Sequence, residues 1–60
     1  MMKTIKLKSK TTSDDFTKFC NKCEKDGVFV ASWTEGRAKF IQVRFDNEID
    51  FKAWVVSLSI

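Results

Sequence analysis

The sequence contains no proline, no histidine and no tyrosine, and it has only two glycines and two cysteines among its 60 residues. The absence of histidine excludes a Ser-His-Asp triad, a Cys-His pair and any imidazole metal ligand. The isolated glycines, Gly27 and Gly36, exclude a glycine-rich phosphate loop and a dinucleotide fingerprint. A chain this short also has little room for a pocket with convergent polar groups. We therefore expect a protein that is not an enzyme and that needs no cofactor and no metal.

Long apolar runs are also missing. No stretch approaches the roughly 18 apolar residues of a membrane span, and the basic N-terminus is not followed by the apolar core of a signal peptide. The composition, with 43% hydrophobic and 32% charged residues, is typical of a globular protein. We expect one small domain over residues 1–60, without a membrane partner and located in the cytoplasm, which is the host-cell cytoplasm if the chain is viral.

Charge is concentrated at one end of the chain. The first ten residues hold four lysines and no acid, at Lys3, Lys6, Lys8 and Lys10. Because the net charge of the whole chain is +3, the remaining residues are left with a net charge of −1. The chain therefore has one basic edge, which either guards a sheet edge against pairing or contacts acidic groups or phosphates.

Alternation of apolar and polar residues over positions 3–10 predicts the first strand, with Ile5 and Leu7 on its buried face. A helix follows from Thr12 or Ser13, either of which suits the N-cap. Its apolar face recurs at helical spacing and ends before Gly27, which we expect to close the helix with a positive φ. The residues of this face are Phe16, Phe19, Cys20 and Cys23.

Two β-rich runs, residues 28–33 and 39–45, flank a turn and predict a hairpin. A three-residue loop ending in Gly36 needs a positive φ only at the glycine, and we favour it for that reason. It places three residues of the first run on the buried face with Ile41, Val43 and Phe45, namely Phe29, Ala31 and Trp33.

The alternative is a two-residue turn on Glu35-Gly36, which would require Glu35 to adopt a positive φ. That turn would join Val28 and Val30, rather than Trp33, to the buried face. The choice of loop does not affect one group of residues on the last strand: in both registers Phe40, Gln42 and Arg44 lie together on the face opposite Ile41 and Val43.

The C-terminal segment predicts a second helix over residues 47–57. Asp46 and Asn47 offer an N-cap, and two apolar sets recur at helical spacing. These sets are Ile49, Ala53, Val56 and Ile60, and Phe51, Trp54, Val55 and Leu58. The alternative is a strand over residues 54–60, because several of these residues are β-branched. The expected fold is a two-layer α+β domain of order β-α-β-β-α, with a three-stranded sheet and two helices on one face.

The motif most open to misinterpretation is Cys20-Asn21-Lys22-Cys23, which matches C-x-x-C. In thioredoxin-like sites the first cysteine lies at a helix N-terminus, where the dipole favours thiolate. Here the pair follows two helical turns and completes the apolar stripe of Phe16 and Phe19. We therefore expect buried, reduced thiols, and treat redox chemistry or a metal shared with another chain as the minor alternatives.

The sheet face away from the helices is the best candidate site. We expect Lys6 and Lys8 of the first strand to share it with Phe40, Gln42 and Arg44. An exposed phenylalanine among basic residues suits an acidic protein surface, and in its chemistry it resembles platforms that stack single-stranded nucleic acid.

The size and composition favour a non-enzymatic binding module that recognises another protein and inhibits or regulates it. Small accessory proteins, including those carried by phages and plasmids, commonly act in this way. The alternative is a small nucleic-acid-binding protein that uses the basic sheet face. The thin core and the apolar C-terminus are also compatible with a homodimer.

Overall fold

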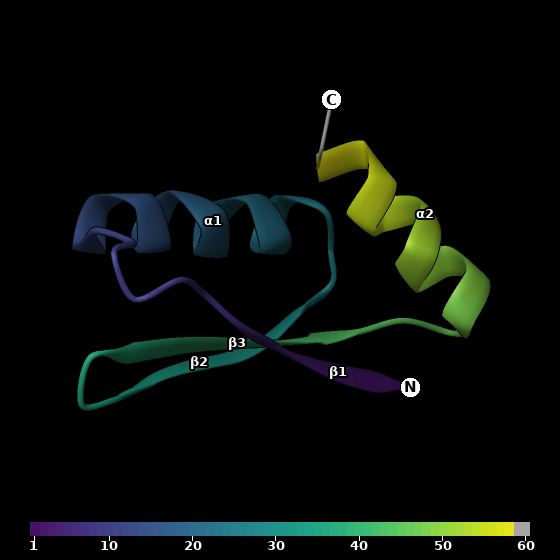
Figure 1. Ribbon diagram of the computed structural model, residues 1–60. Coiled ribbons are helices and arrows are strands. Elements are labelled where there is room, and N and C mark those ends of the chain that lie inside the picture. The colour runs from purple at the N-terminus through teal and green to yellow at the C-terminus, as the bar shows by residue number, and fades with distance from the viewer. Residues whose placement is uncertain (59–60) are drawn as a thin grey trace.

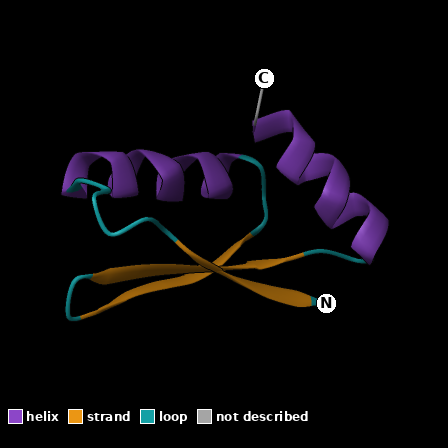
Figure 2. Cartoon of the chain, in the orientation of Figure 1, coloured by secondary structure: helices purple, strands orange, loops and turns teal. Residues whose placement is uncertain are grey.

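The computed structural model describes residues 1–58. The elements follow the order β1 (Met2–Lys6), α1 (Ser13–Lys25), β2 (Phe29–Glu35), β3 (Ala38–Arg44) and α2 (Glu48–Leu58). The strands form one antiparallel sheet of order β1-β3-β2, so that β3 is central. Both helices lie on the same side of this sheet (Figures 1 and 2). The predicted α+β fold is confirmed.

The sequence signals at both ends of α1 act as expected. Thr12 is the N-cap, and its hydroxyl oxygen accepts a hydrogen bond of 3.1 Å from the backbone N–H of Asp15. Gly27 adopts a φ of +74° after the helix ends, a conformation that a residue with a Cβ resists. The chain can therefore turn back directly into β2.

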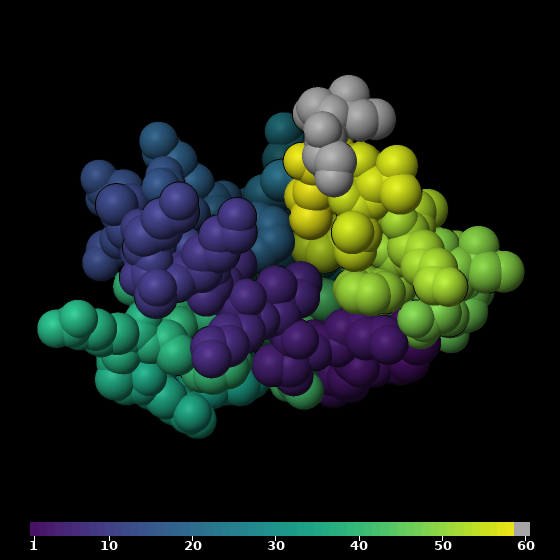
Figure 3. Space-filling view, viewed as in Figure 1, coloured from purple at the N-terminus to yellow at the C-terminus, as the bar shows by residue number. Residues whose placement is uncertain are grey.

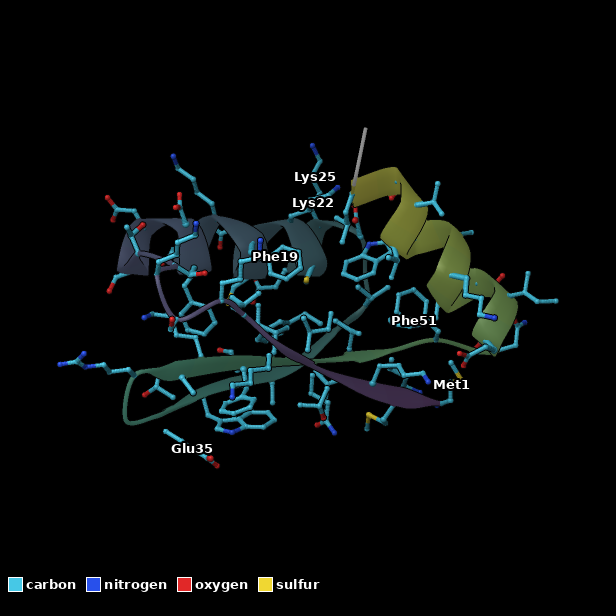
Figure 4. All side chains as sticks on the ribbon, in the orientation of Figure 1. Met1, Phe19, Lys22, Lys25, Glu35 and Phe51 are labelled. Atoms are coloured by element: carbon cyan, nitrogen blue, oxygen red, sulfur yellow. The ribbon has the colours of Figure 1, made fainter. Side chains whose placement is uncertain are left out.

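The core lies between the sheet and the helices. Five side chains are buried, and they come from α1, from the central strand and the residue after it, and from α2. They are Cys23, Ile41, Val43, Phe45 and Trp54. Phe19 and Phe51 point from the two helices into the same space, whereas Lys22 and Lys25 point away from the sheet (Figure 4).

The hairpin turn differs from both of the loops expected from the sequence. Glu35 pairs with Ala38, so the loop consists of Gly36 and Arg37. Gly36 has a φ of +61° while Arg37 does not have a positive φ, which matches a type II′ turn with glycine in its first central position. This turn also confines the positive φ to Gly36, but it lies one residue further along the chain than either expected loop.

A β-bulge in β2 then decides which of its side chains are buried. From the turn, the register pairs Trp33 with Phe40 and Ala31 with Gln42, and it shifts between Ala31 and Phe29. An inserted residue reverses the alternation of faces, so Phe29 lies opposite the buried Val43. Phe29 therefore packs against the core as predicted. The prediction that Ala31 and Trp33 share this buried face is wrong.

Strand β1 is shorter than the alternation predicted. It ends at Lys6, although the N–H of Leu7 still donates a 2.9 Å hydrogen bond to the carbonyl of Lys39 in β3. Ile5 and Leu7 pack against the core, as expected. Lys8 and Lys10 lie beyond the strand, in the connection to α1, so pairing with β3 does not fix them on a face of the sheet.

Helix α2 begins where the sequence indicated. Asn47 accepts a 2.9 Å hydrogen bond at Oδ1 from the backbone N–H of Asp50. The helix continues to Leu58, so the alternative of a strand from Trp54 is wrong for the described part of that segment. Ile60, a member of one predicted apolar set, lies outside the described residues.

Apolar packing and polar contacts together hold α2 against the rest of the molecule, where it lies directly beside the N-terminal segment (Figure 3). The indole Nε1 of Trp54 donates a 2.8 Å hydrogen bond to Oδ2 of Asp26, at the end of α1. Lys3 of β1 forms an ion pair of 3.2 Å with Glu48, and its ammonium lies 5.2 Å from the centroid of the Phe51 ring. Lys3, one of the four N-terminal lysines, therefore serves to attach α2.

Candidate binding face of the sheet

The side of the sheet opposite the helices carries one set of alternating side chains from each strand. On β3 these are Ala38, Phe40, Gln42 and Arg44, whose side chains are on the other face of the sheet from the buried Ile41 and Val43. The register brings three residues of β1 and three of β2 onto the same side. We call this surface the open face; it comprises Met2, Thr4, Lys6, Ala31, Trp33, Glu35, Ala38, Phe40, Gln42 and Arg44.

An aromatic pair occupies the end of the open face nearest the hairpin loop. The rings of Trp33 and Phe40 are stacked, with centroids 5.5 Å apart and an angle of 12° between their planes. Both side chains are half-buried, although no helix lies on this side of the sheet. Lys6 pairs with Phe40 from the other neighbouring strand. A row of Lys6, Phe40 and Trp33 therefore crosses all three strands.

The remaining predicted site residues follow along β3. Gln42 lies across from Thr4, and Arg44 lies across from Met2. Arg44 is exposed and is four residues from Phe40, which corresponds to about 14 Å along an extended strand. The open face therefore has an aromatic end and a cationic end, with an amide between them.

The structure brings together four of the five predicted site residues. Lys6, Phe40, Gln42 and Arg44 share the open face, whereas Lys8 lies two residues beyond the end of β1. Lys8 is exposed, but the strand does not carry it onto this surface. The alternation of lysines suggested a longer strand than the sheet contains: β1 ends at Lys6, opposite Phe40, although β3 itself extends to Ala38.

Trp33 is the residue of the open face that the sequence reasoning missed. Its placement follows from the register: the favoured loop would pair Trp33 with Arg37, whereas the observed turn pairs it with Phe40. A register change by an odd number of residues moves every side chain of a strand to the other face. The signal was present in Gly36-Arg37, because glycine in the first position is the signature of a type II′ turn.

An open hollow of about 610 Å³ adjoins the cationic end of the open face. Its wall includes Arg44 and the carboxylates of Asp46 and Asp50, together with apolar groups from β1 and the start of β2. The full lining is Met2, Gly27, Val28, Phe29, Val30, Arg44, Phe45, Asp46 and Asp50. With charges of both signs and an exposed apolar part, the hollow can receive a polar side chain at the margin of a larger interface.

The cysteine pair lies on the other side of the molecule. Cys23 is fully buried in the core, and Cys20 is half-buried beside it. Burial, followed by the nearby Cys20 and Asp26, raises the pKa of the Cys23 thiol from 9.0 to about 11. A thiol of this kind stays protonated near neutral pH, which disfavours its use as a nucleophile or a metal ligand. The placement supports the interpretation of Cys23 as part of the core.

Residues 1–58 contain neither a cluster of metal ligands nor a membrane-spanning helix. No group of three or more metal-binding side chains is close enough to hold an ion in this part of the chain. No helix among these residues is both long and apolar enough to cross a bilayer.

Comparison of the chain with protein-family models, with curated proteins and with solved structures gave no match.

Proposed function

We propose that this chain is a non-enzymatic binding module that recognises another protein through the open face, and that it inhibits or regulates that protein by covering part of its surface. The observation that carries the proposal is the stacked pair of Trp33 and Phe40 on a sheet face that no helix covers. Tryptophan and arginine are the residues most enriched at the energetic centres of protein interfaces, and large aromatic anchors supply contact area at a small entropic cost.

The distribution of polar groups around the pair supports a protein partner. Gln42 and Thr4 offer neutral hydrogen-bonding groups beside the aromatic end, and Arg44 can donate two parallel hydrogen bonds to a carboxylate. An aromatic anchor bordered by polar and charged residues is a common composition of a protein interface. The partner surface that fits has an apolar depression and an acidic residue about 14 Å away, which is the spacing of four residues along β3.

Nucleic-acid binding is the second candidate, and the position of Lys6 favours it. Lys6 lies beside Phe40 on the open face, so a phosphate and a base could be contacted together. The acid of the open face, Glu35, lies two residues from Trp33 on β2, beside the loop (Figure 4), and is the charge that disfavours a phosphate there. A single-stranded nucleic acid would be held mainly by phosphate contacts, and its affinity would fall steeply with salt.

The experiment that separates the two candidates is an affinity capture from lysate with and without nuclease treatment. Three forms are compared: the wild-type chain, the Arg44→Glu variant and the Arg37→Glu variant. Arg37 lies in the hairpin loop, so its substitution makes the same change of charge without altering a residue of the open face. The proposal expects a protein that survives nuclease, that is retained by Arg37→Glu and that is lost with Arg44→Glu.

Two results would decide against the proposal. Capture that disappears on nuclease treatment would favour the nucleic-acid candidate, as would affinity for single-stranded DNA that falls steeply with salt. Equal loss of the partner with Arg37→Glu and Arg44→Glu would show that net charge, rather than the open face, mediates binding.

A further inference from the structure

The two edges of the sheet are protected very differently. Strand β1 forms one edge and carries Lys3 and Lys6 within five residues. Strand β2 forms the other edge, and its seven residues include no lysine, no proline and one charge, Glu35, at the very end. Proteins commonly guard edge strands with lysine, proline or bulges. The bulge of β2 affects its beginning, so the segment Ala31–Glu35 is a regular edge without such protection.

The backbone groups on this edge can be assigned from the register. The carbonyl of Lys39 accepts a hydrogen bond from Leu7, so it points toward β1 and away from β2. Thr34 lies opposite Lys39, and its N–H and carbonyl are therefore directed outward, away from β3. The same alternation directs the N–H and the carbonyl of Ser32 outward. Both residues are exposed, and β2 pairs with β3 alone among the described strands.

We propose that a second copy of this chain pairs with β2 along this edge, antiparallel and with the two-fold axis at Trp33. An axis at Trp33 uses the whole regular segment Ala31–Glu35 and leaves the bulge outside the pairing. It sets Ser32 opposite the partner's Thr34, so the outward N–H and carbonyl groups of both residues are hydrogen-bonded. The two sheets become one sheet of six strands.

The side chains fit this arrangement better than they fit any pairing through β1. Trp33 lies directly opposite the partner's Trp33 on the open face, which forms a cross-strand aromatic pair. The row of Lys6, Phe40 and Trp33 continues into the same three residues of the partner in reverse order. The result is a line of four aromatic rings with a lysine at each end.

Charge also permits this pairing. Glu35 lies opposite the partner's Ala31, and the two Glu35 side chains are four residues apart along the paired strands, which is about 14 Å. That separation exceeds the Debye length of about 8 Å at physiological salt, so their repulsion is largely screened. Pairing of β1 with itself would instead bring lysines of both copies together.

The test compares three lysine substitutions by sedimentation equilibrium over a range of protein concentrations. Ser32→Lys places a charge on the β2 edge, Thr4→Lys places the same charge on β1, and Ile49→Lys places it on the outer side of α2. Ile49 is 78% exposed and Val56, one of its neighbours on that apolar stripe, is 62% exposed, so α2 is the main competing interface. All three substituted residues are exposed, which favours folding of every variant.

The wild-type chain is expected to show a reversible monomer–dimer equilibrium. Ser32→Lys should weaken dimerisation by about tenfold or more, because the introduced lysines of the two copies then lie diagonally across the paired strands, about 7 to 8 Å apart. Thr4→Lys and Ile49→Lys should leave it unchanged. A wild-type chain that stays monomeric up to millimolar concentration would overturn the proposal, and so would a dimer weakened by Ile49→Lys but not by Ser32→Lys.

Amide hydrogen exchange on the wild-type chain gives a measurement that does not depend on any variant. The amides of Ser32 and Thr34 should exchange more slowly as the protein concentration rises, because dimerisation hydrogen-bonds them. The amide of Lys3 in β1 serves as the reference. Equal exchange at low and high concentration at Ser32 and Thr34, in a sample shown to be dimeric, would place the dimer interface elsewhere and contradict the proposal.

Discussion

The substitution Phe40→Ala tests the open face most directly, and it should lower both the stability of the fold and the affinity for a partner. Phe40 is half-buried and stacks on Trp33. Loss of the aromatic pair removes about 1 kcal/mol, and loss of the partial burial removes about 1 kcal/mol more. A chain of this size has a total stability of about 3 to 9 kcal/mol. The variant should therefore fold, with a melting temperature lower by roughly 10 °C.

The effect of Phe40→Ala on binding should be larger than its effect on the fold. A buried aromatic anchor typically contributes 2 kcal/mol or more to binding, which corresponds to about a thirtyfold loss of affinity. Arg44→Glu is the companion variant. Arg44 is exposed, so its substitution should change the free energy of unfolding by no more than about 0.5 kcal/mol while it weakens binding.

The assay pairs two measurements on each variant: urea unfolding followed by far-ultraviolet circular dichroism, and titration calorimetry with the captured partner at a temperature where the variant is folded. Arg37→Glu in the hairpin loop is the control, and it should match the wild-type chain in both. The reasoning would be refuted by a Phe40→Ala variant that folds and binds with wild-type affinity. Complete unfolding of Phe40→Ala would also count against it, because Phe40 would then belong to the core.

Four further substitutions test particular parts of the structure. Gly36→Val should lower the free energy of unfolding in urea by more than about 1 kcal/mol, and backbone strain alone would be the cause, since a Cβ at Gly36 would meet nothing within 4 Å. Cys23→Ser should lower the free energy of unfolding by about 1 to 3 kcal/mol and Cys20→Ser by less, with binding intact. The pKa of Cys23 is higher in the folded chain than in the unfolded chain, so the stability that the protonated thiol contributes is lost as the pH rises from the unfolded pKa through the folded one. Wild-type stability should therefore also decline above about pH 9. Trp54→Phe removes the hydrogen bond that, with Lys22, holds the pKa of Asp26 below its ordinary value. The stability that Asp26 contributes is present above the pKa of its unfolded state and is lost as the pH falls through the lowered pKa of the folded state. The variant should therefore lose less stability than the wild-type chain on acid titration.

The elements of the fold were predictable because their signals are local. Thr12 and Asn47 cap the helices through contacts with residues three positions away, and Gly27 ends α1 through its own backbone angle. None of these signals depends on the rest of the molecule. The apolar stripe that includes Phe19 and Cys23 likewise identified the buried face of α1.

The faces of β2 were not predictable in the same way, because they depend on pairing between strands. The criterion of a positive φ at Gly36 alone was correct, but the type II′ turn on Gly36-Arg37 satisfies it with a different register. The bulge between Phe29 and Ala31 has no comparable sequence signal here, since it arises from the fit of β2 to β3. The loop position and the bulge do not affect the predicted set Phe40, Gln42 and Arg44. Alternation within β3 alone places these three side chains on one face.

The proposed partner binding and the proposed self-association both use Trp33, so the two would be coupled. Trp33 stacks on Phe40 within one copy, and in the proposed dimer it also meets the partner's Trp33. A protein that contacts the whole aromatic row would bind the dimer more tightly than the monomer. By thermodynamic reciprocity, binding of that protein would raise the dimerisation equilibrium constant by the same factor. The side chains of Ser32 and Phe40 lie on opposite faces of the sheet, since their register partners are Ile41 and Trp33. Substitution of Ser32 can therefore remove the dimer without touching the open face, and the affinity that remains is that of a single copy.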